Sequence, residues 1–419
     1  MIYPKFLEKG DTIGVPAPSD GSYDELHINK QKNAKLKMEQ TGYKIVQSKN
    51  IYSSVKGRSA NAKLRAEELN SMFEDKNINF IICAAGGEFL VECLPYVDFN
   101  KIVQNPKFVQ GFSDPTGVLF QLTTKYDIAT IYSMNFGDFG TENYSRDIID
   151  NLEIISGNLI KQESYEMFEN ERAEKITGLE GYNYSDKVEW KTLDNKEATI
   201  KGRIIGGCLD LIAELSGTKY DEVRSFLEKY KQDGIIWYFD NCDLSKEELI
   251  RTLWKFNELE YFKYTKGIVF GRCGNDNSYL NYTMEQTLQD SVISNLNVPI
   301  IYDADISHKG PSMTIINGAI ATICSENGKG NIEFELKWYS MNIEKGVKLI
   351  MKELELDVTG MMCTGCENRI KNALGEIKGI ESVEANHETG KVKITSKNEI
   401  DKTKAKEIIE RLDFKVNEN

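Results

Sequence analysis

The amino-acid sequence predicts an α/β protein with a separate small unit at its C-terminal end. Short apolar runs alternate with stretches of helical periodicity through most of the 419 residues, as in parallel βαβ units with helices on both faces of a sheet. Residues 350–419 instead read strand, helix, strand, strand, helix, strand, the order of a ferredoxin-like βαββαβ unit. At about 100–200 residues per domain, this length corresponds to two or three domains.

The first domain is expected at residues 1–160. Its predicted strands are 12–16, 44–47, 80–84 and 108–111, and its predicted helices are 31–40 and 59–73. From Thr141 to Lys196 the chain is polar and irregular, which indicates a linker and a loop that folds over a site. Ligands of such sheets bind at the carboxyl ends of the strands.

The second domain is expected at residues 161–345 and the third at 350–419. Strands of the second are predicted at 198–205, 234–239, 267–270, 298–302, 318–323 and 331–338, with helices at 208–216 and 245–258. In the third, strands are predicted at 352–358, 382–385, 391–395 and 414–416, with helices at 366–377 and 402–412.

Composition narrows the class of partner. A net charge of −13 without a long basic block argues against nucleic acid and against an anionic membrane surface, so we expect a small substrate. No run reaches the about 18 apolar residues of a membrane span, and the first residues lack a signal-peptide core. We therefore expect no membrane partner and a cytoplasmic location.

Histidine is scarce, which makes any imidazole base easy to find. Of the three histidines, His27 lies in a polar helix-like stretch and His387 in a polar turn. His308 follows a strand-like run in Asp303-Ala304-Asp305-Ile306-Ser307-His308. If the chain uses imidazole as a general base, His308 is the candidate.

Ser113 is the candidate nucleophile. It ends an apolar strand in Gly111-Phe112-Ser113-Asp114-Pro115-Thr116, where a tight strand-to-helix turn would expose its hydroxyl and direct the N–H of Asp114 at an oxyanion. The alternative is a simple helix N-cap, since Ser before Asp-Pro-Thr is common capping chemistry.

Two further strand ends carry the remaining candidate residues of the site. Gly86 and Gly87 follow the strand ending at Cys83, where backbone amides can approach a bound group closely; alone, the pair is merely a turn. Asp240 ends the strand 235–239, and its carboxylate could orient His308 toward Ser113. The alternative for Asp240 is a turn-opening residue.

Several motifs in order resemble the LD-carboxypeptidase family of serine peptidases, across about residues 1–340. These motifs are Gly10-Asp11-Thr12-Ile13-Gly14, Ala17-Pro18-Ser19, Ala85-Gly86-Gly87, 94–99, Gly111-Phe112-Ser113-Asp114, 202–210 and 303–308. The resemblance implies a Rossmann-like first domain, a smaller α/β second domain, a homodimer and a Ser-Glu-His triad at the boundary between the domains.

The resemblance also implies roles and a substrate. Ser113 corresponds to the nucleophile, His308 to the base, Asp240 to the acid, and the N–H groups of Asp114 and of Gly86 or Gly87 to the oxyanion hole. Family members hydrolyse the bond to the terminal D-alanine of murein tetrapeptides during peptidoglycan recycling, or an aminoacyl-nucleotide peptide amide in the microcin-immunity branch. Hydrolysis needs no cofactor in this family.

Two departures from the family surround the base. Asp240 stands where the family has Glu, and a carboxylate displaced by about 1 Å can cost about a hundredfold in rate. Ser307 stands where the family has Gly, and a positive φ there would strain a serine. The alternative function is therefore a catalytically weakened, hydrolase-like protein that binds metal.

Cys363 and Cys366 differ from the six isolated cysteines, which we expect to be small buried hydrophobic residues. They form Cys-x-x-Cys between the first strand and first helix of the third domain, where two thiols can meet one metal ion. The alternative is a redox dithiol. The segment Gly360-Met361-Met362-Cys363-Thr364-Gly365-Cys366 resembles a heavy-metal-associated domain of the copper-chaperone type. Two thiolates, with Met362 before the first, favour Cu(I) or another soft metal ion over Zn(II).

Overall fold

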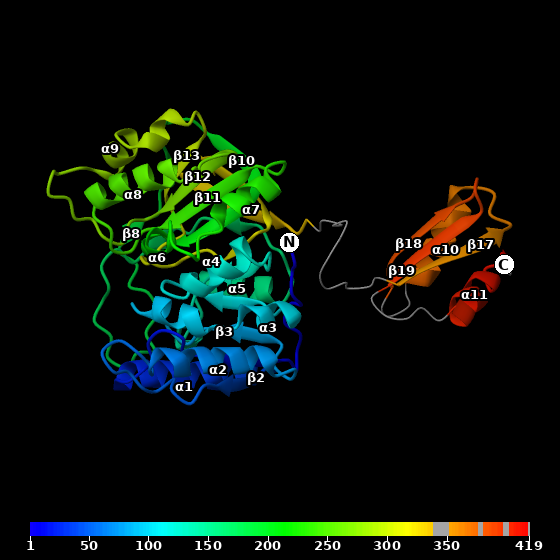
Figure 1. The fold of residues 1–419 in the computed structure, drawn as a ribbon, viewed down its shortest axis with the longest axis horizontal. Helices are drawn as coiled ribbons and strands as arrows, with labels where there is room; N and C mark the ends of the chain where they lie inside the picture. Colours follow the sequence, from blue (N-terminus) through cyan, green and yellow to red (C-terminus); the bar gives the residue numbers. More distant parts are fainter. Residues whose placement is uncertain (338–351, 376–379, 397–401, 418–419) are drawn as a thin grey trace. The chain divides into compact units, whose positions relative to one another are not determined.

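The computed structural model describes residues 1–337, 352–375, 380–396 and 402–417. Two compact units divide the chain: a large unit, Met1–Tyr339, and a small unit, Ser340–Asn419 (Figure 1). No helix of the described residues is long and apolar enough to cross a membrane.

The first sheet of the large unit has the strand order β14-β5-β4-β3-β1-β2. Five of these strands run parallel: β1 (Thr12–Val15), β2 (Lys44–Gln47), β3 (Phe80–Ile82), β4 (Val109–Gly111) and β5 (Thr130–Tyr132). The parallel sheet expected from the alternating pattern is confirmed. An antiparallel strand from far along the chain, β14 (Ile315–Asn317), adds to the edge of β5.

The helices of this part are α1 (Glu25–Gln40), α2 (Ala62–Glu74), α3 (Phe99–Gln104), α4 (Thr116–Thr124) and α5 (Arg146–Ile155). Helices α1 and α2 lie on the outer side of the first sheet, and α4 lies between the two sheets of the large unit (Figure 1). Side chains on all sides of α4 are buried, because the helix packs against both sheets.

Helix α5 corrects one expectation. The chain was expected to be irregular from Thr141, but Ile148, Ile154 and Ile155 form one buried face of a regular helix. Buried polar residues interrupt the apolar pattern of this face in the sequence. Asp147 is one of them: its carboxylate is buried and accepts hydrogen bonds from the Tyr182 hydroxyl at 2.9 Å and the Ser312 N–H at 3.3 Å.

The second sheet has the order β6-β16-β15-β10-β11-β12-β13-β9. Its central strands are parallel: β10 (Ala198–Cys208), β11 (Ile235–Asp240), β12 (Thr265–Gly271) and β13 (Ile300–Ala304). Strands β15 (Ile320–Glu326), β16 (Lys329–Glu335), β6 (Gln162–Glu163) and β9 (Lys191–Thr192) extend it in antiparallel fashion.

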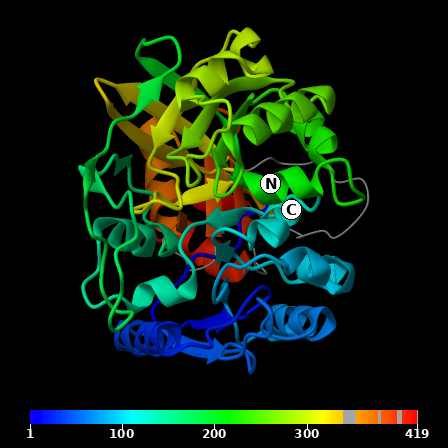
Figure 2. The ribbon, with the colours of Figure 1, turned by 90° about the vertical axis from the view of Figure 1, so that its left-hand side faces the viewer.

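The helices beside the second sheet are α6 (Leu209–Leu215), α7 (Val223–Tyr230), α8 (Lys246–Glu258) and α9 (Met284–Gln289). Helices α8 and α9 lie at the opposite end of the large unit from α1 and α2, as the turned view also shows (Figure 2). Ser113 follows the carboxyl end of β4 in the first sheet, and Asp240 stands at the carboxyl end of β11 in the second.

The small unit is a four-stranded antiparallel sheet with two helices. Its elements in chain order are β17 (Lys352–Thr359), α10 (Thr364–Gly375), β18 (Ile380–Asn386), β19 (Lys391–Ser396), α11 (Lys402–Glu410) and β20 (Lys415–Asn417). The sheet order is β18-β19-β17-β20. A core that includes Val358, Ile370, Val392 and Ile409 holds the helices against the sheet.

Candidate active site and candidate metal-binding loop

Ser113 lies on a tight turn between β4 and α4. Its φ of +67° is in the left-handed region, which a residue other than glycine adopts only at a cost in backbone strain. Gly111 makes the turn possible, because a Cβ there would lie 2.5 Å from the Cβ of Pro115. The serine is half-buried, and the strained turn is the arrangement expected of an exposed nucleophile.

The glycine loop after β3 lies directly against Ser113. A Cβ on Gly86 would stand 3.2 Å from Ser113 Cβ and 3.5 Å from its Oγ. The Asp114 carboxylate holds this loop, since it accepts a hydrogen bond from the Leu90 N–H at 2.8 Å and another from the Ser19 hydroxyl. Within the described part of the chain, the N–H groups of Gly86, Gly87 and Asp114 donate no hydrogen bond. The geometry therefore leaves them available to an oxyanion.

His308 and Asp240 meet at the end of the second sheet. Asp240 is the last residue of β11, and its Oδ2 lies 2.9 Å from Nδ1 of His308, with the aspartate side chain 0% and the histidine side chain 9% exposed. The contact is an ion pair when the imidazole is protonated, and neither ring nitrogen makes a hydrogen bond of good geometry to another described residue. The imidazole ring packs on Phe112, the neighbour of Ser113, with centroids 4.5 Å apart.

The charge of Asp240 controls the protonation of His308. Burial alone would lower the pKa of the imidazole, but the Asp240 carboxylate, together with the neighbouring Cys242, outweighs burial and raises the pKa of His308 to about 10. A group with such a pKa is protonated at neutral pH. To act as a base it must first lose this proton.

Close approach of two backbones brings the halves of the site together. A Cβ on Gly206 would lie 1.8 Å from the carbonyl oxygen of Tyr238, and one on Gly207 would lie 2.7 Å from Cγ2 of Thr116 at the start of α4. The Cys208 N–H donates to the Thr116 hydroxyl at 3.1 Å. Glycine at position 206 lets β10 pair closely with β11, and glycine at position 207 lets β10 approach the start of α4 beside the turn that carries Ser113.

The condition for backbone strain at Ser307 is not met. Its φ is not positive, and its hydroxyl donates to the Arg272 carbonyl at 2.6 Å and accepts the Lys309 N–H at 2.9 Å. The side chain therefore fixes the loop on both sides of His308, a function that a glycine hydrogen atom could not perform.

Arg272 is a buried residue of this site that the sequence analysis missed. Its guanidinium pairs with the buried Asp305 and donates to the carbonyls of Lys309 and Pro311, both at 2.7 Å. The signal was available, because Arg272 is a charged residue directly after a buried parallel strand, β12. Tyr132, whose hydroxyl donates to Oδ2 of Asp240 at 2.8 Å, was also missed. An aromatic residue in an apolar strand gives no signal of such a contact.

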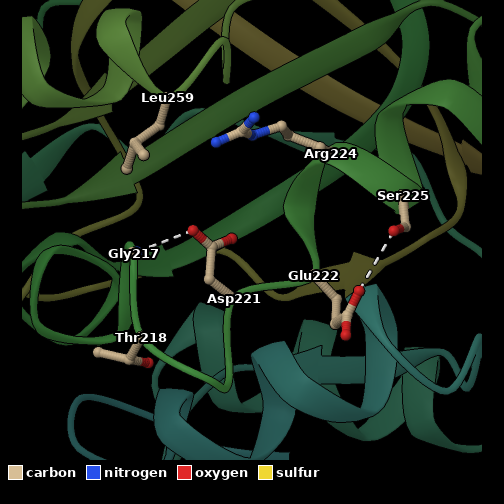
Figure 3. Close-up of a pocket in the computed structure, with 7 residues that line it drawn as sticks. All are labelled: Gly217, Thr218, Asp221, Glu222, Arg224, Ser225 and Leu259. Carbon is tan, nitrogen blue, oxygen red and sulfur yellow. Dashed lines mark hydrogen bonds between the residues drawn. The ribbon is translucent and has the colours of Figure 1, made fainter.

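Two hollows of the large unit lie beside the site rather than in it. One cavity of about 250 Å³ borders the His308 loop and is lined by residues that include Arg272, Asp276, Asp303 and Lys309. Another, of about 260 Å³, lies between α7 and the end of α8, where the Gly217 N–H donates to Asp221 (Figure 3). None of Ser113, Asp240 and His308 lines either one.

The isolated cysteines are largely buried, as expected. Cys83, Cys93, Cys208 and Cys273 are buried, while Cys242 and Cys324 are half-buried. Burial raises the pKa of the Cys83 thiol to about 12 and that of Cys93 to about 11. These two thiols are therefore poor nucleophiles and poor metal ligands at neutral pH.

Cys363 and Cys366 in the small unit have a different environment. Cys363 is exposed, its Sγ lies 3.9 Å from that of Cys366, and the second cysteine sits in the first turn of α10. A backbone hydrogen bond from Met362 lowers the pKa of the Cys366 thiol, and Cys363 and Arg369 add to the effect. Two metal–sulfur bonds of about 2.3 Å span at most about 4.6 Å, so one soft ion fits between these sulfurs.

Comparisons with known proteins agree with this geometry. Residues 13–133 match the description "LD-carboxypeptidase N-terminal domain", and residues 201–323 match "LD-carboxypeptidase C-terminal domain". A putative carboxypeptidase of Vibrio cholerae is 26% identical over 80% of this chain and 98% of its own length. The microcin C7 self-immunity protein MccF of Escherichia coli is 22% identical over 77% of this chain and 92% of its own.

A solved structure has the same fold as the large unit. The MccF-like protein of Bacillus anthracis superposes with a TM-score of 0.65 and 25% identity over 80% of this chain and all of its own. Residues 355–415 match the description "Heavy-metal-associated domain". Over 73 residues the chain is 32% identical to the copper-exporting P-type ATPase of Staphylococcus haemolyticus, or 16% of this chain and 9% of that protein.

Proposed function

The chain belongs to the LD-carboxypeptidase family and carries a heavy-metal-associated domain, and we propose that it is a serine hydrolase whose nucleophile is Ser113. One observation carries the proposal: the buried carboxylate of Asp240 lies 2.9 Å from His308, and the His308 ring packs beside the strained Ser113 turn. The Ser113 turn, the imidazole and the carboxylate thus lie at the ends of two sheets, which supports the proposal.

The proposed reaction proceeds through an acyl-enzyme. The Ser113 hydroxyl attacks the scissile carbonyl carbon while Nε2 of His308 accepts the hydroxyl proton, and Asp240 stabilises the resulting imidazolium. The N–H groups of Asp114 and of Gly86 or Gly87 bind the oxyanion. His308 then gives its proton to the leaving amine, and water, activated by the same imidazole, releases the acyl group.

We propose a peptide substrate with a terminal D-amino acid, as in a murein tetrapeptide, or a related peptide amide. The family supports the first class, and the likeness to a microcin self-immunity protein supports the second. The test incubates the protein with murein tetrapeptide, its all-L counterpart and a panel of aminoacyl-nucleotide amides, at pH 7 and pH 10. Ser113→Ala is the control. Equal turnover by both proteins would refute the proposal.

The second candidate is a weakened hydrolase that mainly binds metal. The short Asp240 carboxylate and Ser307 motivated it, yet Asp240 reaches His308 and Ser307 is hydrogen-bonded without strain. We therefore favour an active enzyme. Asp240→Glu and Ser307→Gly distinguish the candidates: a large gain in hydrolysis by either variant would indicate a weakened enzyme, and a loss would indicate a site adapted to these residues.

We propose that Cys363 and Cys366 hold one Cu(I) ion. Among the described residues, no third His, Cys, Asp or Glu joins the two thiols to make a metal-binding group, and a two-thiolate site suits Cu(I) better than Zn(II), which prefers four ligands. The bound ion would be either transported cargo or a regulatory signal. We propose that hydrolysis does not require a metal ion. Competition with a chromogenic Cu(I) chelator measures the affinity, with Zn(II) as the comparison.

The homodimer and the cytoplasmic location remain predictions. Sedimentation of the full chain tests the first, and cell fractionation tests the second.

A further inference from the structure

Tyr132 connects the two halves of the proposed site. It is the last residue of β5, it is completely buried, and its strand neighbour on β4 is Gly111, two residues before Ser113. Its hydroxyl donates to Oδ2 of Asp240 at 2.8 Å and accepts the Ser113 N–H at 3.4 Å. One phenol therefore contacts both the strained turn of the nucleophile and the carboxylate on the other sheet.

The phenol and the imidazole share one oxygen atom. Oδ2 of Asp240 lies 2.8 Å from the Tyr132 hydroxyl and 2.9 Å from Nδ1 of His308, while Oδ1 accepts the His308 backbone N–H at 3.3 Å. A donor on a carboxylate oxygen fixes its orientation and takes up part of its negative charge. Tyr132 thus affects both where the carboxylate points and how strongly it holds the imidazolium.

We propose that Tyr132 is a positioning residue that aligns Asp240 with His308 and anchors the Ser113 turn. This inference rests on the proposed serine hydrolase, and it extends that proposal by a residue that never touches the substrate. It also offers a physical reason why an aspartate can serve where a longer acid is usual: the phenol fixes the oxygen of the short carboxylate that faces the imidazole.

Other charged or titratable groups surround this arrangement. Cys242 faces His308, and Cys208 and Tyr238 face Asp240. Arg272 and Lys309, on the same side of the loop, are paired with Asp305 and Asp276.

The test compares Tyr132→Phe with Tyr238→Phe in the full chain. Tyr238 is a matched control, because it is equally buried, its ring lies 5.8 Å from that of Tyr132, and its hydroxyl donates to Asn317 at 3.0 Å rather than to the site. The first readout is the titration of His308 by NMR. Only two other histidines, His27 and His387, contribute signals, and His308→Gln assigns the third.

Tyr132→Phe should raise the pKa of His308 by about half a unit or more, because the imidazolium then has the carboxylate charge to itself. Tyr238→Phe should leave it unchanged. With an active preparation, Tyr132→Phe should also lower kcat by about ten- to a hundredfold with little change in KM, as expected for misplacement of the reacting groups. An unchanged titration of His308 in Tyr132→Phe, or an equal shift in both variants, would overturn the inference.

The two proposals can fail separately. If no substrate is hydrolysed, the NMR titration still decides whether Tyr132 acts on Asp240 and His308. If Tyr132→Phe does not fold, a fluorotyrosine placed at position 132 keeps the ring and hydroxyl but donates a stronger hydrogen bond. It should lower the pKa of His308, and no change would equally overturn the inference.

Discussion

Replacing Asp240 by asparagine removes the negative charge that faces His308 while keeping nearly the same shape. The amide can still accept the Tyr132 hydroxyl, so the main change is electrostatic. In the native protein the pKa of His308 is raised from 6.5 to about 10, against the effect of burial. Without the carboxylate, burial, the largest single effect, is opposed only by Cys242, and we expect the pKa of His308 to fall to about 6.5 or below.

The size of this change sets two measurable effects. A fall from about 10 to about 6.5 is between about three and four pKa units, on the order of 4–5 kcal/mol of interaction between imidazolium and carboxylate. Because the folded pKa lies above the unfolded one, this interaction stabilises the native state fully below about pH 6.5. The stabilisation is lost as the pH rises through about 10. The stability difference between native protein and Asp240→Asn should therefore shrink over that window.

The assay is the pH dependence of kcat/KM, which reports groups of the free enzyme. The native protein should gain activity with a midpoint near pH 10, and Asp240→Asn should do so near pH 6.5 or lower. Above pH 10, where both imidazoles are neutral, the variant should be slower by about a hundred- to ten-thousandfold, because its imidazolium lacks a counter-charge. Asp243→Asn, an exposed neighbour, is the control. A native midpoint near pH 7, or the same midpoint in both proteins, would refute the reasoning.

Three further outcomes are expected. Arg272→Ala breaks a buried ion pair and should lower the free energy of unfolding by about 3–5 kcal/mol in urea titrations. Replacing the exposed Arg251 by Ala should change it by less than about 0.5 kcal/mol, and equal effects of the two variants would contradict the role of the buried Arg272–Asp305 pair. Gly86→Ala places a methyl 3.2 Å from Ser113 Cβ and should reduce kcat by more than about tenfold, whereas Gly181→Ala, with nothing within 4 Å, should not. Cys363→Ser with Cys366→Ser should abolish Cu(I) retention against a chelator and leave metal-free hydrolysis intact, with Cys324→Ser as the control; copper retained by the double variant would place the metal elsewhere.

The sequence was informative where a residue was rare or stood at the end of a strand. His308 stood out because histidines are scarce, and Ser113, Gly86 and Asp240 each follow an apolar run. Parallel topology places Ser113 and Gly86 at the carboxyl edge of the first sheet and Asp240 at that of the second. Their roles stay predictions until the variants are measured.

The remaining features depend on contacts between distant segments. Tyr132 looks like any aromatic core residue, and only the pairing of β4 with β5 and the approach of the second sheet give its hydroxyl two partners. The buried face of α5 was hidden by polar residues such as Asp147, whose carboxylate accepts hydrogen bonds from Tyr182 and Ser312, far along the chain. Ser307 was judged from an assumed φ, and its hydrogen bonds could not be read from its neighbours.

Strand β14 has a mechanical consequence. Ala304 ends β13 in the second sheet and Ile315 begins β14 in the first, so the intervening segment with His308 is anchored at both ends to different sheets. A hinge motion that spread the sheets apart would pull on this tether and draw the imidazole away from its acid. The polypeptide after β5 also cannot be cut away without stripping an edge strand from the first sheet. The two sheets of the large unit are therefore mechanically coupled. Shortening or lengthening the segment between Ala304 and Ile315 by one residue would first displace His308 from Asp240.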